Sequence, residues 1–471
     1  MRASGWRPNP EVLDAVFKAY DVRGLVPDQL DEPLAEAVGA AFARHTGAAA
    51  VVVGHDMRSS SPGLAEAFTA GVTGAGADVV AIGLASTDEL YYASGVLDAP
   101  GAMFTASHNP AVYNGIKLCR AGAVPVGTDS GLADIRALVA GERRSPASSP
   151  AADRPAADRP TAGRGAVRTA DLLADYADHL HTLAPVRGRR LTVVVDAGNG
   201  MAGLTAPAVL GSLDLDLTVL YGELDGSFPN HEANPIDPEN LRDLCARVRE
   251  LGADVGLAFD GDADRCFLVD ERGRPVDPSL LTALIAVREL AKEPGATVIH
   301  NLITSRAVPQ VIVEHGGVPV RTRVGHSYIK ATMATTDAIF GGEHSGHFYF
   351  RDFWRADSGM LAALHALGAL AETDQPLSEL LARYSRYVAS GEINSTVADQ
   401  QAVLAALERE WAGDGVDVDH LDGLTVTAAD WWFNVRASNT EPLLRLNAEA
   451  KDEATMARVR DAVLATIRRR P

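Results

Sequence analysis

The sequence predicts an α/β protein built from three similar α/β units and a C-terminal α+β unit. The length of 471 residues corresponds to about three domains, or to four small ones. Apolar segments of strand length repeatedly end in polar or glycine-rich loops, with helical patterns between them. A segment rich in proline and alanine, residues 141–168, interrupts this pattern, which then starts again. We therefore expect several sheets whose strand ends carry the functional loops.

The composition is that of a globular protein with an acidic surface. Lys and Arg number 43 and Asp and Glu 62, so the formal charge of −19 argues against binding nucleic acids or anionic membranes. Three cysteines are too few for a disulfide framework and suit a reducing compartment. The N-terminus has no apolar signal-peptide core, and no apolar run approaches the roughly 20 residues of a membrane helix. We expect a cytoplasmic protein, and nothing in the sequence implies a protein partner.

The first α/β unit is predicted over residues 1–145. Strands are expected at residues 48–53, 78–82 and 100–105, and the helix between the first two runs from about Ser60 to Gly76. A linker, residues 146–168, follows, in which AADRP occurs twice.

The later units are predicted at residues 169–272, 273–386 and 387–471. The second begins with a helix from Asp171, and its strands are expected at residues 191–195 and 253–259. Strands of the third unit are expected at residues 297–299 and 318–323. The C-terminal unit is predicted to hold strands at residues 424–427, 431–436 and 443–448 and a helix at about 452–469.

The segment DGDADR, residues 260–265, places three carboxylates at alternate positions after an apolar strand. Their repulsion is costly unless a cation lies between them, and an all-oxygen set favours Mg²⁺ or Ca²⁺ over zinc. An EF-hand loop and a solvated acidic turn are the alternatives. Arg265 stands where an EF-hand needs glycine, and the next residues read as a strand. The segment therefore predicts a metal site at Asp260, Asp262 and Asp264.

The segment TASHNP, residues 105–110, also follows an apolar strand. The hydroxyl of Ser107 on this turn can act as a nucleophile or carry a phosphoryl group, although an ordinary Ser-Asn turn explains the hexapeptide equally well. No GxSxG motif is present to favour an α/β-hydrolase. Lys117 nearby offers a cation for a phosphate.

Three further segments carry polar groups of defined chemistry. In GGEHSGH, residues 341–347, Glu and Ser suit sugar hydroxyls, and a zinc site through His344 and His347 lacks an HExxH motif or a cysteine partner. In RASNTEP, residues 436–442, a guanidinium and neutral donors suit a phosphate. FKAYDVRG, residues 17–24, taken alone reads as a solvated turn.

These segments converge on phosphoryl transfer, which requires positioning and charge neutralisation. Neither a Walker A loop nor a GxGxxG motif at a strand–helix junction is present, so nucleotide hydrolysis and dinucleotide redox chemistry lack their usual loops.

The sequence resembles the α-D-phosphohexomutases, most closely the bacterial phosphomannomutase/phosphoglucomutase group. The resemblance extends over nearly the whole chain, with the motifs in the family's order: FKAYDVRG, TASHNP, DGDADR, VGHSYIK, GGEHSGHFYF and RASNTEP. It implies a four-domain architecture in which three α/β domains and a C-terminal α+β domain surround a central cleft.

The resemblance also implies roles for individual residues. Ser107 would be the phosphoserine, completing a Mg²⁺ site with Asp260, Asp262 and Asp264. Arg265 would lie beside the reacting sugar, whose hydroxyls Glu343 and Ser345 would bind. The phosphate that is not transferred would be bound by Arg436, Ser438, Asn439 and Thr440. Proton transfer at the reacting hydroxyl would involve one of Arg23, Lys117, His326 and His347.

The implied reaction moves phosphate between O1 and O6 of a hexose phosphate. Phospho-Ser107 would phosphorylate a hexose monophosphate, and the resulting hexose 1,6-bisphosphate, both intermediate and activator, would turn round and return its other phosphate. Closure of the fourth domain would exclude water, which would otherwise hydrolyse the phosphoserine. The partners implied are hexose 1-phosphate and 6-phosphate substrates, and the cofactor is Mg²⁺.

Three features depart from the family's pattern. Ile303 stands where relatives often carry lysine, His344 stands where methionine is common, and the linker is unusually long; the first two bear on substrate preference. Asn439, within SNT, favours the phosphomannose/phosphoglucose group over phosphoglucosamine mutases, which usually read SGT. Phosphoglucosamine mutase and a non-catalytic phosphosugar-binding protein remain the alternatives.

Overall fold

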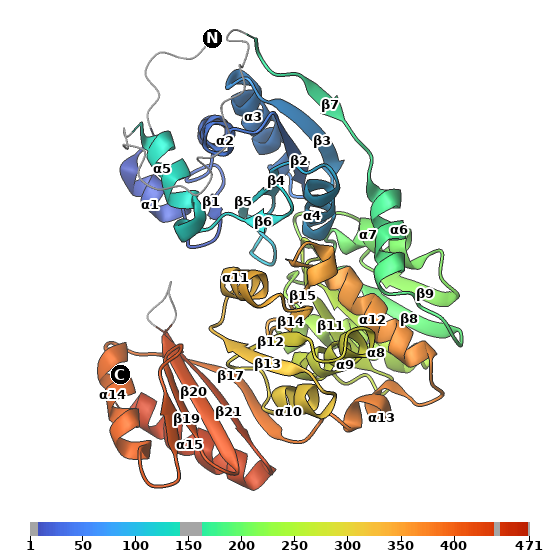
Figure 1. Ribbon diagram of the computed structural model, residues 1–471, viewed down its shortest axis with the longest axis vertical. Helices are drawn as coiled ribbons and strands as arrows, with labels where there is room; N and C mark the ends of the chain where they lie inside the picture. Colours follow the sequence, from blue (N-terminus) through green and yellow to red (C-terminus); the bar gives the residue numbers. More distant parts are fainter. Residues whose placement is uncertain (1–7, 142–162, 438–442, 470–471) are drawn as a thin grey trace. The chain divides into compact units, whose positions relative to one another are not determined.

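The computed structural model describes residues 8–141, 163–437 and 443–469 and divides into two compact units. The first unit comprises Met1–Val276 and Tyr349–Asp374, and the second comprises Asp277–Phe348 and Gln375–Pro471. The chain therefore leaves the first unit, returns to it for one short segment, and leaves it again. Figure 1 labels helices and strands of both units where there is room.

The first unit opens with a seven-stranded sheet in the order β1-β5-β4-β2-β3-β7, with β6 paired to β5. Its strands are β1 (Val22–Leu25), β2 (Ala50–His55), β3 (Asp78–Leu84), β4 (Gly101–Phe104), β5 (Tyr113–Arg120), β6 (Val124–Pro125) and β7 (Val167–Thr169). Its helices are α1 (Pro10–Val16), α2 (Glu32–Thr46), α3 (Ser61–Gly74), α4 (Thr87–Val96), the 3₁₀ turn η1 (Thr128–Ser130) and α5 (Leu132–Ala140). Strands β3, β2 and β4 run parallel, so their carboxyl ends share one edge.

Apolar residues on both faces of this sheet produce three layers. Side chains alternate along a strand, and accordingly Val51 and Val53 join one core cluster with α2 and α3, whereas Val52 joins another with α4. In the first cluster Phe68 makes an edge contact with Phe104 at a centroid distance of 5.4 Å. Burial on both faces explains why the β2 segment reads as a continuous apolar run.

A second sheet in the first unit has the order β11-β10-β8-β9. Its elements are α6 (Leu173–Leu183), β8 (Leu191–Asp196), α7 (Ala202–Leu210), β9 (Leu215–Leu220), the 3₁₀ turn η2 (Pro238–Leu241), α8 (Arg242–Leu251), β10 (Val255–Phe259) and β11 (Cys266–Asp270). Strand β10 runs parallel to β8 and antiparallel to β11. The loop between β10 and β11 is therefore a tight connection at the carboxyl end of β10.

The returning segment completes the first unit. It contains most of β15 (Phe348–Phe350), which begins at the last residue of the second unit, then the 3₁₀ turn η3 (Arg351–Phe353), β16 (Ala356–Asp357) and α12 (Gly359–Ala371). The Ser358 hydroxyl accepts the Leu361 N–H and so caps α12, while donating to Asp88 of α4 at 2.6 Å. A buried hydrogen bond thus joins this segment to the first sheet's helical layer.

The second unit begins with parallel strands in the order β13-β12-β14. Its first elements are α9 (Pro278–Lys292), β12 (Thr297–Asn301), α10 (Ala307–Glu314), β13 (Val318–Thr322), α11 (His326–Thr336), β14 (Phe340–Gly342) and α13 (Leu377–Ala382). The carboxyl ends of β12 and β14 lie side by side, which places Asn301 close to Glu343.

An antiparallel five-stranded sheet, β17-β21-β20-β19-β18, completes the second unit. Its elements are β17 (Val388–Thr396), α14 (Gln400–Trp411), β18 (Asp417–Asp419), β19 (Leu424–Thr427), β20 (Trp431–Ala437), β21 (Leu443–Ala450) and α15 (Glu453–Arg468). Helices α14 and α15 pack on the face that carries Phe433, Leu444 and Leu446. The alternate residues, among them Arg436 and Arg445, form a polar opposite face.

The predicted elements are found with shifted ends. Strand β19 covers residues 424–427 as predicted, and β2 and β10 each begin two residues later than expected. Residues 167–169 of the predicted linker and its border instead form β7, because the edge of β3 is open for parallel pairing. The elements that the prediction did not name include β1, β5, β9, α2, β17, β18 and α14; residues 142–162 of the linker lie outside the described residues.

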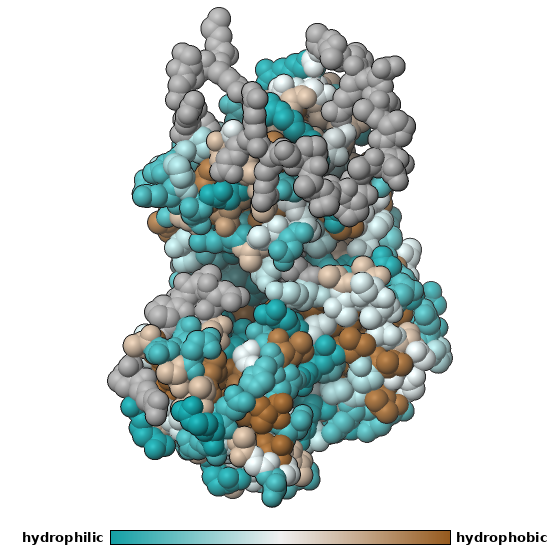
Figure 2. Space-filling model, turned by 60° about the vertical axis from the view of Figure 1, so that its left-hand side comes forward, coloured by the Kyte–Doolittle hydropathy of each residue, from teal (hydrophilic) through white to brown (hydrophobic). Residues whose placement is uncertain are grey.

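The face of the molecule shown in Figure 2 is mostly hydrophilic, with hydrophobic residues in several separate groups. Exposed apolar side chains in separate groups of this kind are ordinary for a protein surface. Among the described residues, no helix combines the length and apolar character needed to cross a bilayer. The three cysteines, Cys119, Cys245 and Cys266, are buried, and none of them forms a disulfide.

Candidate active site

Ser107 lies in the loop that follows β4, in a backbone conformation that side chains rarely adopt. Its φ is 50°, and its amide donates to the Thr105 hydroxyl at 2.9 Å. The left-handed region costs a non-glycine residue about 1–2 kcal/mol, so surrounding contacts must hold Ser107 there. Its hydroxyl donates to Oδ2 of Asp260 at 2.7 Å, across 153 residues of sequence.

The three aspartates of DGDADR lie in the loop between β10 and β11, at the carboxyl end of β10. They are 0–1 % exposed, and their carboxylate oxygens come within 4.8 Å of one another. Ala263 between them has φ 61°, which turns the loop so that alternate side chains converge. The structure therefore gathers the triad as the spacing predicts.

Gly261 allows the aspartate loop, residues 260–265, to approach the Ser107 loop, residues 105–113. A Cβ at position 261 would lie 2.4 Å from the carbonyl oxygen of Ser107. Glycine is thus required by the close approach of two backbones and not by its own dihedral angles.

Lys117, on β5, lies between two of the aspartates. Its ammonium is 2.6 Å from Oδ2 of Asp262 and 2.6 Å from Oδ2 of Asp264. Burial alone would raise the pKa of Asp262, but the charge and hydrogen bond of Lys117 hold that pKa below its usual range. Burial and the charges of Asp262 and Asp264 raise the pKa of Asp260 to about 8.

The donor set fits a hard divalent cation. Three buried carboxylates bring more negative charge than Lys117 alone balances, and burial together with the charges of Asp262 and Asp264 raises the pKa of Asp260. Oδ1 of Asp262 is buried without a hydrogen-bond partner among the described residues. Oxygen-only ligands of this kind suit Mg²⁺, which keeps further positions for water or phosphate oxygens.

Two arginines adjoin the same loops. Arg23, on β1, donates to Asn109 Oδ1 at 2.8 Å and forms an ion pair with Asp21 at 2.5 Å. The Arg265 guanidinium lies 3.4 Å from Asp260. Strand β1 pairs with β5, which fixes Arg23 beside the Ser107 loop.

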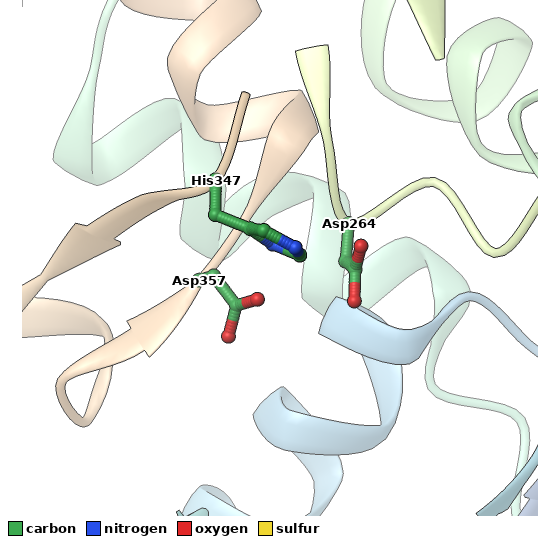
Figure 3. Close-up of side chains that lie close together, drawn as sticks. All are labelled: Asp264, His347 and Asp357. Carbon is green, nitrogen blue, oxygen red and sulfur yellow. The ribbon is translucent and has the colours of Figure 1, made fainter. Parts of the chain in front are cut away.

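Sequence reasoning missed two residues at this site. Thr87, the first residue of α4, donates its hydroxyl to Asp262 at 2.6 Å and its amide to the Asp262 carbonyl at 3.0 Å. Asp357, on β16, is buried, and one of its carboxylate oxygens lies within 4.8 Å of one of Asp264 (Figure 3). Neither residue belongs to a recognisable motif, so only the fold identifies them.

The predicted sugar-binding loop lies in the second unit, at the carboxyl end of β14. Glu343 is 2 % exposed, and its carboxylate accepts the Gly325 amide at 3.1 Å and the Ser345 hydroxyl at 3.4 Å. Its own amide donates to the carbonyl of His347, a largely buried residue. Predicted residue His326 is the first residue of α11.

Arg436, on the polar face of the last sheet, is held by a carboxylate. It lies 2.6 Å from Glu392, which also contacts Arg445 at 3.1 Å. Arg436 and Arg445 are directly opposite on neighbouring strands, so two guanidinium groups lie side by side. The predicted phosphate-binding residues Ser438, Asn439 and Thr440 lie outside the described residues.

A small cavity, partly open to solvent, lies in the second unit. Ile303 and His344, the two residues that depart from the family's pattern, both line it. Polar lining residues include Ser305, Asn447 and Glu449, and burial raises the pKa of Glu449.

The structure brings Ser107, the three aspartates, Lys117, Arg23 and Arg265 together in the first unit. Glu343, Ser345 and His347 form a second group within the second unit, where Arg436 also lies.

Comparison with known proteins matches four profiles in order. They are described as Phosphoglucomutase/phosphomannomutase alpha/beta/alpha domain I (residues 14–144), domain II (174–273) and domain III (277–387) and the C-terminal domain (392–466). The chain is 40% identical over 457 residues to "Phosphohexose mutases" of Xanthomonas campestris pv. campestris, covering 96% of this chain and 99% of that protein. It is 39% identical over 460 residues to "Phosphomannomutase" of Escherichia coli K12, covering 96% and 98%.

Solved structures agree with these sequence matches. A phosphoglucomutase/phosphomannomutase family protein from Burkholderia thailandensis has a TM-score of 0.84 and 32% identity over 96% of each chain. A protein described as a phosphomannomutase from Thermus thermophilus has a TM-score of 0.79 and 25% identity, covering 96% of this chain and 98% of that one.

The fold and the matches define a four-domain enzyme with three α/β/α domains and a C-terminal domain. The chain belongs to the phosphoglucomutase/phosphomannomutase family, and it is an isomerase of the phosphohexomutase type.

Proposed function

We propose that this chain is a magnesium-dependent phosphomannomutase/phosphoglucomutase that moves phosphate between O1 and O6 of a hexose phosphate. The observation that carries the proposal is the 2.7 Å contact between the Ser107 hydroxyl and Asp260, within a buried set of three aspartates. The names of relatives at 36–40% identity, phosphomannomutase and phosphomannomutase/phosphoglucomutase, support the same reaction.

Ser107 is the group that carries the phosphoryl. Its phosphate ester is attacked by a hydroxyl of the hexose monophosphate; the bond to Ser107 Oγ breaks, and the hydroxyl loses its proton to a neighbouring base. The second half returns the other phosphate of hexose 1,6-bisphosphate to Ser107, so phosphate is conserved. Mg²⁺ held by Asp260, Asp262, Asp264 and the Ser107 group would neutralise charge on the transferring phosphoryl.

The remaining predicted residues bind and orient the sugar phosphate. Glu343 and Ser345 bind sugar hydroxyls, and Arg265 lies beside the reacting sugar. The phosphate that is not transferred is bound by Arg436, Ser438, Asn439 and Thr440. Arg23, Lys117, His326 and His347 are the candidates for proton transfer. The division of the chain at residues 145, 168, 272 and 386 likewise stays a prediction.

The cavity in the second unit supports a role for Ile303 and His344 in substrate preference. Both line it beside Ser305 and Asn447, so they shape the same space. Because position 303 carries isoleucine in place of lysine, its side chain gives the cavity an apolar surface at this point.

Replacement of Ser107 by alanine tests the proposal. Ser107→Ala is expected to abolish interconversion of mannose and glucose 1- and 6-phosphates, while Ser212→Ala, in an exposed turn, retains it. Purified wild-type protein is expected to carry about 80 Da of additional mass on Ser107, the mass of one phosphoryl group. Near-wild-type turnover by Ser107→Ala contradicts the proposal, and absent turnover in the wild type favours a passive phosphosugar-binding protein.

Sugar preference is tested by comparing kcat/KM for mannose, glucose and glucosamine 1-phosphates. We expect mannose and glucose phosphates to be preferred. A clear preference for glucosamine 1-phosphate would replace the proposal by phosphoglucosamine mutase.

A further inference from the structure

Arg58 lies in the turn between β2 and α3, and it is one of the largest fully buried side chains, 1 % exposed. No motif identifies it in the sequence. An isolated buried guanidinium is costly, so its partners must be good hydrogen-bond acceptors.

The acceptors of Arg58 are concentrated on the Ser107 loop, which we define as residues 105–113. One terminal nitrogen donates to the carbonyls of Ser107 at 2.8 Å and Asn109 at 2.7 Å. The other donates to the carbonyls of Pro110 at 2.9 Å and Tyr113 at 3.0 Å. Nε lies 3.2 Å from Asp56, so all five N–H donors of the guanidinium are used.

The contact with the Ser107 carbonyl explains how an unfavourable backbone conformation persists. Rotating Ser107 out of the left-handed region would swing its carbonyl oxygen away from Arg58. The same carbonyl oxygen faces Gly261, where a Cβ would come within 2.4 Å. Arg58 therefore fixes the residue whose hydroxyl must meet the aspartate triad.

Residues 225–228, in the connection between β9 and η2, cover the Arg58 side chain. The Phe228 ring lies over the guanidinium, 5.1 Å from its centre to the Arg58 Cζ atom, and Phe228 itself has φ 52°. A Cβ at Gly226 would lie 2.5 Å from the Arg58 Cα. Close backbone packing and the ring together hold the guanidinium plane in one orientation.

The covering segment is tied to the aspartate loop. The Asp225 amide donates to the Asn199 carbonyl at 3.0 Å, and the Met201 amide donates to the Gly261 carbonyl at 2.9 Å. Contacts thus run from Arg58 through residues 225–228 and 199–201 to Gly261. This chain of contacts joins the two loops that carry the proposed nucleophile and its metal ligands.

We propose that Arg58, clamped by Phe228, is a positioning residue that holds the Ser107 hydroxyl in register with the aspartate triad. The inference rests on the proposed phosphoryl-carrying role of Ser107. Among the described residues, the side chain of Arg58 contacts backbone carbonyls, Asp56 and Phe228, and it contacts no side chain that we assign to metal or sugar phosphate binding. Its loss should therefore slow phosphoryl transfer without weakening sugar phosphate binding.

Arg58→Lys tests this role, because lysine keeps the charge but cannot reach four carbonyls. In metal-loaded full-length protein, kcat per phosphorylated molecule is expected to fall by about 10- to 100-fold, with KM changed by less than about threefold. The rate at which hexose 1,6-bisphosphate phosphorylates Ser107 is expected to fall in parallel. Arg189→Lys is the matched control, since Arg189 also binds a carboxylate, Asp254, and a backbone carbonyl, Thr373.

Phe228→Leu is a second variant, which keeps Arg58 and all the groups that donate hydrogen bonds to the Ser107 loop from it. It is expected to lower kcat in the same direction by a smaller factor. The fold-loss in kcat of the double variant should be smaller than the product of the two single losses, because both substitutions act on the same contact. If Arg58→Lys yields no folded protein, Phe228→Leu decides the question alone.

Three results would overturn the inference: unchanged kcat per phosphorylated molecule, a rise in KM with kcat retained, or an equal loss in Arg189→Lys. These outcomes are separate from failure of the proposed function. A wild-type protein that turns over no hexose phosphate contradicts the function, whereas active wild type with equally active Arg58→Lys contradicts only the role of Arg58.

Discussion

The ammonium of Lys117 lies 2.6 Å from Oδ2 of Asp262, the same oxygen that accepts the Thr87 hydroxyl at 2.6 Å. This oxygen is therefore shared between a cation and a neutral donor. A divalent cation among the aspartates would share these carboxylates with Lys117, and the lysine balances part of their charge beforehand.

Mg²⁺ is expected to stabilise the metal-depleted protein, because three buried carboxylates repel one another without it. Binding at 100 times the dissociation constant adds about 2.7 kcal/mol to the free energy of unfolding, measured as a rise in Tm. Asp262→Asn should lose most of this rise. Asp243→Asn, which changes an exposed carboxylate that accepts the Tyr221 hydroxyl, should keep it. Equal shifts in both variants would argue against a triad metal site.

Gly261→Ala is expected to lower kcat by at least about 100-fold, because its Cβ would push the Ser107 carbonyl and displace the hydroxyl from Asp260. Gly74→Ala, near the end of α3 where a Cβ meets nothing within 4 Å, is the control and should leave kcat unchanged. Steady-state kinetics on hexose phosphates measure both. A fully active Gly261→Ala would show that the two loops tolerate separation.

Glu89 predicts a dependence of stability on pH. Burial and the charge of Asp88 raise its pKa to about 8, from an ordinary value of 4.5. The stability contributed by protonated Glu89 is complete below the ordinary pKa and is lost as pH rises through about 8.

Glu89→Gln keeps a neutral side chain at every pH, so its free energy of unfolding should fall less than that of the wild type as pH rises from about 5 to 9. At the alkaline end the variant should be the more stable protein. Urea unfolding at several pH values measures this, with exposed Glu66→Gln as the control. Parallel pH profiles for the wild type and Glu89→Gln would contradict the raised pKa.

Arg436→Gln is expected to raise KM for hexose phosphates by roughly 10- to 100-fold, since a charged hydrogen bond to phosphate is worth about 1.5–3 kcal/mol. The Glu392 carboxylate, now balanced by Arg445 alone, would further repel the anion. The effect on kcat should be smaller. Arg460→Gln, an exposed ion pair with Asp461 on α15, is the control, and an unchanged KM in Arg436→Gln would remove Arg436 from the phosphate site.

The elements that could be predicted from sequence are those with local causes. Strand β19 is short, apolar and bounded by turns, and three alternate aspartates identify the loop after β10. Strand β17 was missed because its residues are half-exposed and irregular, with a bulge between Ala389 and Glu392. Strand β7 was missed because pairing with β3, and not its own composition, makes it a strand.

The same division applies to the candidate site. Ser107 and the three aspartates could be predicted because they belong to short sequence motifs with a recognisable chemistry. Thr87 contacts Asp262 across 175 residues, and Arg58 contacts the Ser107 carbonyl across 49, so neither contact leaves a local pattern. Residues that support others through backbone carbonyls carry no compositional signal, whichever residue type they are.

The return of residues 349–374 to the first unit limits how this chain can be recombined with its relatives. The matched third domain, residues 277–387, contains this stretch, although the stretch packs with the first unit. A chimera that exchanges the third domain as one block would also exchange α12 and Ser358, whose hydroxyl binds the buried Asp88. Such a chimera therefore needs, at position 358, a side chain that can still donate a hydrogen bond to Asp88.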